Sequence, residues 1–91
     1  MNRTANSERS AVAVRAMPLA AAQEGETVRI IRFRGQGQEV KAMIAAGMNV
    51  GRVCPVFGKL PGGGVLVGID DRRLAVGSSA ASEIWVRLVD E

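Results

Sequence analysis

LPGGGVLVGI, residues 60–69, places three consecutive glycines between a proline and an apolar run. Such a loop either cradles a phosphate or reverses the chain between two strands. A phosphate-binding loop needs a helix directly after the glycines, because backbone N–H groups and the helix dipole must converge on the anion. Here the glycines lead into a strand pattern at residues 65–67, and no Gly-Lys-Ser/Thr follows. The stretch therefore predicts a hairpin loop in which glycines supply positive φ angles and Pro61 fixes the entry.

Most of the chain on either side of this loop also has strand character. Segments rich in β-branched residues and bounded by turn residues occur at 27–33, 52–57, 65–70, 73–76 and 83–89. Adjacent Ile30 and Ile31 interrupt the alternation of the first segment, which predicts a bulge. Pro55 cannot donate to a ladder and predicts an edge or a bulge in the second. Asp71–Arg72 is the expected tight turn between the third and fourth segments.

One segment has the period of a helix instead. Residues 38–47 carry an apolar stripe at i, i+3, i+4 and i+7, formed by Val40, Met43, Ile44 and Gly47. Gly47 is a natural left-handed stop, and Met48 behind it is placed for a hydrophobic contact with the last turn. Five short strands and one short helix predict a mainly β fold, a small closed or half-closed barrel that removes free strand edges.

The length of 91 residues allows one small domain with a modest core. Residues 1–16 are polar and then rich in Ala and Val without a clear period, so we expect a flexible extension followed by a domain at 17–91. Leu19 is expected to pack against the core of that domain. The absence of a signal-peptide pattern and of a long apolar span predicts a cytoplasmic protein, and the single cysteine fits a reducing compartment.

The net charge of +3 suggests a nucleic-acid partner until the charges are located. Residues 1–16 hold three basic residues and one acidic residue, whereas residues 17–91 hold nine basic and eight acidic residues. A groove that neutralises several phosphates needs clustered excess charge. The domain has almost none, so we expect no nucleic-acid partner.

The composition also argues against an enzyme. The chain has no histidine and no tyrosine, so a Ser/His or Cys/His couple cannot be built. Cys54 lies in a strand pattern and is expected to be a buried, inert thiol. Asp70 and Asp71 are expected at a hairpin tip, since neighbours in a strand point to opposite faces. No resident cofactor is expected, and weak metal binding through carboxylates is left open without a ligand set.

Five arginines invite two interpretations, either a solvated surface or a basic patch for an acidic partner. They are Arg29, Arg32, Arg34, Arg72 and Arg73. Trp85 is likewise either an exposed interface anchor or a cover for the helix, because it is out of step with its inward-facing neighbours. A groove for proline-rich peptides needs an aromatic lining, which a chain with three aromatic residues hardly supplies.

Several landmarks in chain order resemble the FeoA family, the ferrous-iron transport protein A. They are MPLAAAQEGETVRI (17–30), MIAAGMNVGRV (43–53), FGKLPGGGVLV (57–67), DRRLAV (71–76) and IWVRLV (84–89). In that family a helix ends in a Leu/Ile-x-x-Gly-hydrophobic-x-x-Gly turn, matched here by Ile44, Gly47, Met48 and Gly51. The chain departs from the family in the loop at Leu60–Gly64, which lacks the usual acidic residue.

The resemblance implies an SH3-like β-barrel that serves as a cytosolic accessory of a ferrous-iron (FeoB-type) permease. The implied partner is this transporter, which has a cytosolic G-protein domain, so membrane association would be indirect. The expected contact residues are Lys41, Met48, Lys59, Leu60, Pro61, Gly62, Gly63 and Gly64. The alternatives are a metal- or peptide-sensing domain like those at the C-terminus of iron-dependent repressors and, less favoured, a nucleic-acid-binding barrel. Self-association is left open.

Overall fold

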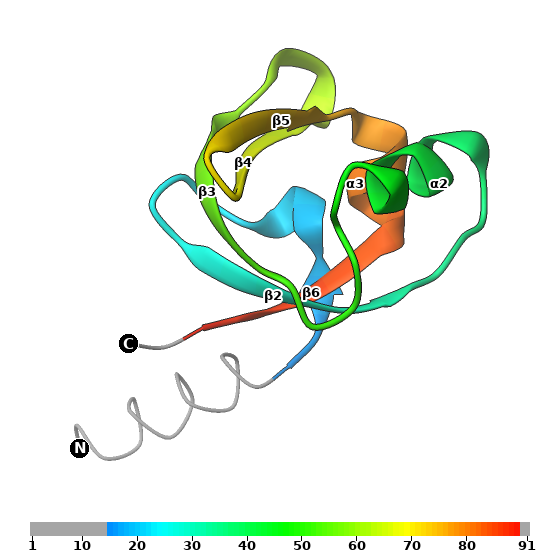
Figure 1. Cartoon of the computed structure of the whole chain (residues 1–91). Coiled ribbons are helices and arrows are strands. Elements are labelled where there is room, and N and C mark those ends of the chain that lie inside the picture. Colours follow the sequence, from blue (N-terminus) through cyan, green and yellow to red (C-terminus); the bar gives the residue numbers. More distant parts are fainter. Residues whose placement is uncertain (1–14, 90–91) are drawn as a thin grey trace.

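The computed structural model of the chain describes residues 15–89 and shows a mainly β fold (Figure 1). Its six strands are β1 (Met17–Pro18), β2 (Thr27–Phe33), β3 (Val53–Lys59), β4 (Val65–Ile69), β5 (Arg72–Val76) and β6 (Ile84–Leu88). Its helices are α2 (Gln38–Ala45), α3 (Ser78–Glu83) and the 3₁₀ turns η1 (Leu19–Ala21) and η2 (Pro61–Gly63). The predicted fold class is confirmed. The expected N-terminal extension lies almost wholly outside the described residues.

The strands form one antiparallel sheet in the order β1-β6-β2-β3-β4-β5. The sheet curls around the core but β1 and β5 are not paired with each other, so the barrel is half closed. The β2–β6 register shifts between Ile30 and Arg32, which confirms the predicted bulge. The β3–β4 register shifts between Val56 and Gly58, just after Pro55, at the point where β3 changes its partner from β2 to β4.

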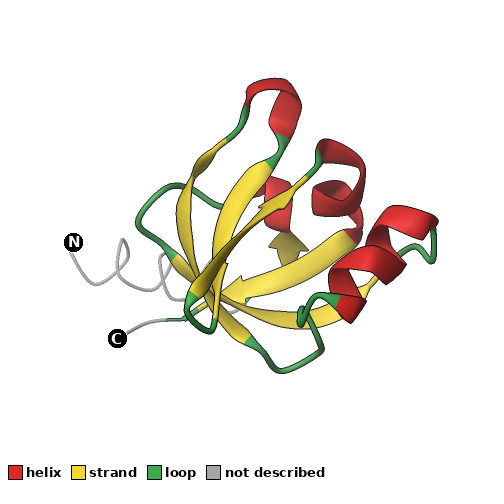
Figure 2. Ribbon diagram, turned by 45° about the horizontal axis from the view of Figure 1, so that its top comes forward, coloured by secondary structure: helices red, strands yellow, loops and turns green. Residues whose placement is uncertain are grey.

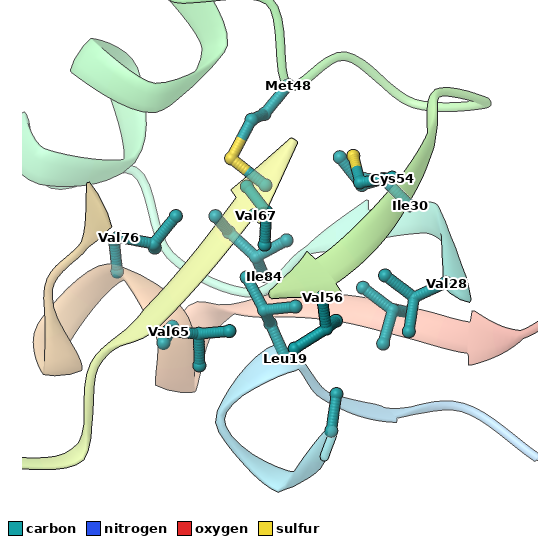
Figure 3. Close-up of a cluster of buried hydrophobic side chains, with 14 of the residues drawn as sticks. Leu19, Val28, Ile30, Met48, Cys54, Val56, Val65, Val67, Val76 and Ile84 are labelled. Carbon is teal, nitrogen blue, oxygen red and sulfur yellow. The ribbon is translucent and has the colours of Figure 1, made fainter. Parts of the chain in front are cut away.

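The interior is filled by aliphatic side chains from every strand except β1, together with η1, α2 and α3 (Figure 3). Leu19 is fully buried, as its position before β2 predicted. Ile84 and Val86 point inward from β6 and are also fully buried. Since the chain has few aromatic residues, close packing of branched aliphatic side chains supplies the hydrophobic stabilisation.

The β4–β5 turn lies one residue earlier than predicted. Ile69 pairs with Arg72, so Asp70 and Asp71 form the two-residue loop. Asp70 has a φ of 57°, in the left-handed region that Asp tolerates better than bulky residues do. The prediction that both carboxylates sit at a hairpin tip is therefore confirmed.

Helix α3 was not predicted from the sequence. Its six residues are too few to show a helical period, and the strand pattern extends the final strand to include Glu83, the last residue of the helix. Ala80 and Ala81 are buried, and α3 packs against η1, α2 and β1. These two small side chains let the helix lie close to its neighbours.

Helix α2 ends as its sequence predicts. The Met48 N–H donates to the Met43 carbonyl at 3.0 Å and the Gly47 N–H donates to the Ile44 carbonyl at 3.0 Å, which is the Schellman arrangement. Gly47 has a φ of 116°, and Met48 is fully buried in the core. The helix is thereby stopped and anchored by two adjacent residues.

Candidate partner-binding surface

The Pro/Gly loop between β3 and β4 is a turn, as predicted, and leads directly into a strand. The Leu60 N–H donates to the Gly64 carbonyl at 2.8 Å and closes the loop. Gly62 and Gly63 have φ angles of 83° and 101°, so the glycines do supply the positive φ values. Pro61, Gly62 and Gly63 are exposed, which makes the tip of the loop available to another molecule.

The base of this loop is tied to the rest of the domain. The Lys59 ammonium donates to the carbonyl of Ala20 and, at 2.7 Å, to that of Ala22. These bonds fix the 3₁₀ turn η1 against β3. Lys59 was expected to meet a partner, but its ammonium already holds two carbonyls of its own chain.

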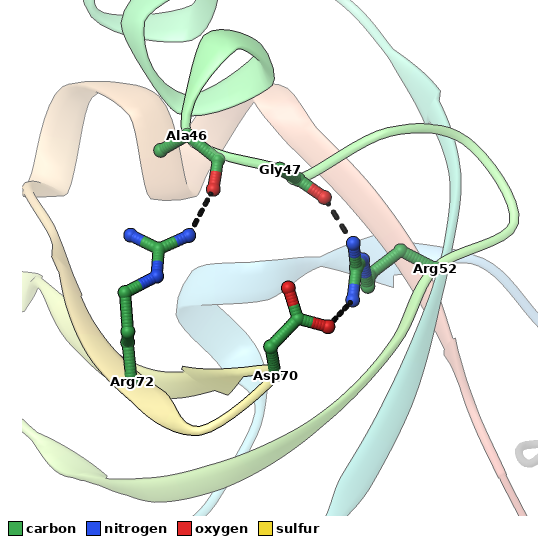
Figure 4. Close-up of polar contacts among 5 residues, drawn as sticks. All are labelled: Ala46, Gly47, Arg52, Asp70 and Arg72. Atoms are coloured by element: carbon green, nitrogen blue, oxygen red, sulfur yellow. Dashed lines mark hydrogen bonds and ion pairs between the residues drawn. The ribbon is translucent and has the colours of Figure 1, made fainter.

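A second exposed element, helix α2, is held at its C-terminal end by two arginines (Figure 4). Arg72 donates to the Ala46 carbonyl at 2.9 Å, and Arg52 donates to the Gly47 carbonyl at 2.9 Å. Arg52 also pairs with the Asp70 carboxylate at 2.9 Å. Cations beside the last carbonyls of a helix complement its dipole. Arg72 therefore serves α2 and does not belong to a free basic patch.

Two hollows flank the N-terminal half of α2. One, of about 250 Å³, is lined by Phe33, Gly35, Gln36, Val40, Lys41 and Ile44. The other, of about 370 Å³, is lined by Gly35, Gly37, Glu39, Val40, Ser79, Ser82 and Glu83. Lys41 is exposed and lines the first hollow, and its role as a contact residue stays a prediction.

The structure places the expected contact residues on two separate elements, the β3–β4 loop and the helix α2 with the turn that follows it. Helix α3 stands between the β3–β4 loop and α2, as Figures 1 and 2 show, and it contacts both η2 and α2. Met48 and Gly64 are buried and cannot offer a side chain or an open backbone to a partner. Both are corrections to the expected contact set. Sequence reasoning missed Ser79 and Ser82 because it did not find α3.

Cys54 is fully buried, which confirms the expectation for its side chain. Burial raises the pKa of the thiol from 9.0 to about 11, against a smaller lowering by the positive charge of Arg52. The reactive thiolate is therefore scarce at neutral pH.

We expect the Cys54 thiol of the native protein to react at least about 100-fold more slowly with iodoacetamide at pH 8 than that of the urea-unfolded chain. The pKa of the Cys54 thiol is higher in the folded chain than in the unfolded chain. Its contribution to the stability of the fold is therefore fully present below pH 9 and is lost as the pH rises to about 11. Mass spectrometry of timed samples measures the rate. Equal rates in native buffer and in urea would contradict the burial of this thiol.

Residues 15–89 contain no cluster of three or more His, Cys, Asp or Glu side chains that would hold a metal ion. No ligand set can therefore be named within this part of the chain. In the same residues no helix is long and apolar enough to cross a membrane.

Comparison with known proteins gives a consistent result. The FeoA domain family matches residues 17–88. A crystal structure of an iron uptake regulatory protein (FeoA) aligns with a TM-score of 0.72 at 18% identity, over 84% of this chain and 100% of that one. An NMR structure of a FeoA-like protein from Clostridium acetobutylicum aligns with a TM-score of 0.73 at 19% identity, over 86% and 92%. At these identities the two structures show a shared fold.

The same fold occurs in a larger protein. A manganese-dependent transcriptional repressor aligns with a TM-score of 0.72 at 26% identity, over 81% of this chain but only 41% of the repressor. No curated protein matches the chain.

Proposed function

The chain belongs to the FeoA family, and on that basis we propose that it acts in ferrous-iron transport as a binding module without catalytic activity, docking on the cytosolic part of a ferrous-iron permease. The observation that carries the proposal is the FeoA domain match over residues 17–88, which includes every strand and helix of the fold. The chain also aligns with the whole of one FeoA structure, which further supports the assignment of the fold to this family.

The geometry supports binding more than chemistry. The exposed features are a closed loop and a helix with hollows beside it, and both are fixed to the barrel by hydrogen bonds from Lys59, Arg52 and Arg72. Exposed loops on a rigid scaffold commonly carry recognition. We infer that the permease contacts the loop tip at Pro61–Gly63, the face of α2 around Lys41, or both.

The experiment is uptake of radioactive Fe(II) by cells whose only ferrous-iron route is the permease. Deleting the gene for this chain should lower the initial rate of uptake, and the intact chain should restore it. We expect Lys41→Glu and Pro61→Glu to restore uptake poorly, because a new acidic group at either exposed site would disturb the interface.

Glu24→Lys is the control, since Glu24 is exposed in the turn before β2, away from α2 and from the loop tip (Figure 1). It should restore uptake like the unaltered chain. Uptake that is unaffected by removing the gene would reject the proposed function, and full restoration by both test variants would reject the assigned surface.

The shared fold with the manganese-dependent repressor favours one alternative, a metal-sensing regulatory domain. Anoxic titration of the purified full-length chain with Fe(II) separates the two. A stoichiometric site of sub-micromolar affinity would favour the sensor, whereas weak, non-stoichiometric binding would favour the transport accessory.

A further inference from the structure

The outer face of β2 and β6 carries a row of exposed arginines. Arg29 on β2 stands directly opposite Arg87 on β6, and Arg32 stands opposite Trp85. Arg34 follows the end of β2, and all four arginines are exposed. These four arginines together with Trp85 are called the arginine face below. Arg87 was not among the arginines grouped from the sequence, because only the pairing of β6 with β2 brings it next to Arg29.

None of the four arginines of this face forms an ion pair in the described part of the chain. Between residues 15 and 89 the one ion pair joins Arg52 to Asp70. Arg29 has a single long hydrogen bond, at 3.3 Å, to the Gly51 carbonyl. Like charges directly opposite each other in an antiparallel pair destabilise the sheet. The Arg29–Arg87 pair is therefore unfavourable for folding, so the two arginines are better explained by binding than by stability.

Trp85 holds two of the arginines of this face against its ring. The Arg32 and Arg34 guanidinium groups each lie 5.2 Å from the centre of its ring. An arginine stacked on an aromatic ring keeps its N–H edge available for bidentate contacts with a carboxylate. The Trp85 indole N–H is enclosed and has no acceptor among residues 15–89. The face thus presents four positively charged donor groups that are not ion-paired among residues 15–89.

We propose that the arginine face binds an acidic protein segment, whose carboxylates pair with Arg29 and Arg87 and whose further oxygens reach Arg32 and Arg34 beside Trp85. Planar guanidinium groups match carboxylates bidentately, which adds direction to the charge attraction. Alternate side chains of an extended segment recur about every 6.6 Å, as do the outward positions along β6. The spacing of carboxylates along an extended acidic segment therefore matches the spacing of the Arg29–Arg87 and Arg32–Trp85 pairs. The inference does not depend on the partner being the permease.

The surroundings of the Trp85 ring argue against an anionic membrane surface and against a single-stranded nucleic acid as the partner. Membrane surfaces and single-stranded nucleic acids use aromatic rings that are free to insert or to stack on bases. Trp85 is half-buried, and guanidinium groups lie over its ring. The face is built for pairing with carboxylates and not for stacking.

The test measures binding of a fluorescent ten-residue polyglutamate peptide to the full-length chain. Saturable binding is expected, and the double variant Arg29→Gln/Arg87→Gln should weaken it by at least about tenfold, since hydrogen bonds to charged groups are the strong ones. The control Arg72→Gln/Arg73→Gln removes the same charge from β5 and should change the affinity by less than about twofold. The melting temperature of the test variant should stay the same or rise, because an unfavourable cross-strand pair is removed.

Vesicles containing phosphatidylglycerol and a 20-nucleotide single-stranded DNA are measured alongside the peptide. The proposal is overturned if the peptide does not bind, or if both double variants weaken it equally. It is also overturned if vesicles or DNA bind more tightly than the peptide and lose that binding in Arg29→Gln/Arg87→Gln. A clear fall in melting temperature in that variant would show that the arginines are structural.

Discussion

Replacing Leu19 by Ala should lower the free energy of unfolding by about 2–5 kcal/mol, the cost of removing a large side chain from a closed core. Leu19 is fully buried although it lies outside the main strands, in the short turn η1 near the start of the described chain. A domain of this size gains little stability beyond what it needs, so the loss is a large fraction of the total. The melting temperature should fall by roughly 10 °C or more.

Leu66→Ala is the matched control. Leu66 lies on β4 between two inward-facing valines and is only half-buried, so the same truncation removes much less buried surface. Urea unfolding of both variants followed by circular dichroism measures the difference. Equal losses would show that the segment before β2 is not part of the core and that the folded domain starts later than residue 17.

Replacing Gly64 by Ala should lower the free energy of unfolding by about 1–3 kcal/mol through overpacking. A Cβ at this position would lie 2.6 Å from the Val76 carbonyl oxygen, closer than such atoms approach in real proteins. It would also lie 3.3 Å from Leu60 Cδ1. The nearest contact is backbone, so relief requires the β3–β4 loop to move away from the end of β5.

Gly77→Ala serves as the control for this prediction. Gly77 is the neighbour of Val76 and has a φ of −65°, and a Cβ added to it would have no other atom within 4 Å beyond its chain neighbours. Gly77 also precedes the first turn of α3, where Ala is less favourable than Gly, and this cost offsets the gain through the unfolded state. Its replacement should therefore change the free energy of unfolding by less than about 1 kcal/mol. Urea unfolding measures both variants. If Gly64→Ala is as stable as Gly77→Ala, the loop does not pack closely against the β5–α3 junction.

The sequence predicted those features whose cause is local. The glycines after Pro61 required a turn because no helical pattern follows them, and Gly47 with Met48 predicted how α2 ends. The bulge at Ile30 followed from two adjacent apolar residues in an alternating strand. In each case the chemistry of a few neighbouring residues determines the backbone.

Features that depend on distant contacts were not predicted. Helix α3 is held by packing on η1 and α2, and its own six residues carry no helical signal. The burial of Gly64 arises from the end of β5, and the roles of Arg52 and Arg72 arise from the fold bringing them to the end of α2. The sequence therefore predicted the exposure of Lys41 and of the loop tip at Pro61–Gly63, but not the burial of Met48 and Gly64 or the hydrogen bonds that hold α2 and η1 in place.

The proposed docking is tested most directly by measuring the dissociation constant between the purified full-length chain and a detergent-purified ferrous-iron permease from the same organism, with GDP and with a GTP analogue. Saturable binding in at least one nucleotide state, weakened by Lys41→Glu or Pro61→Glu and unchanged by Glu24→Lys, is the expected result. Absence of binding in both nucleotide states would contradict the account.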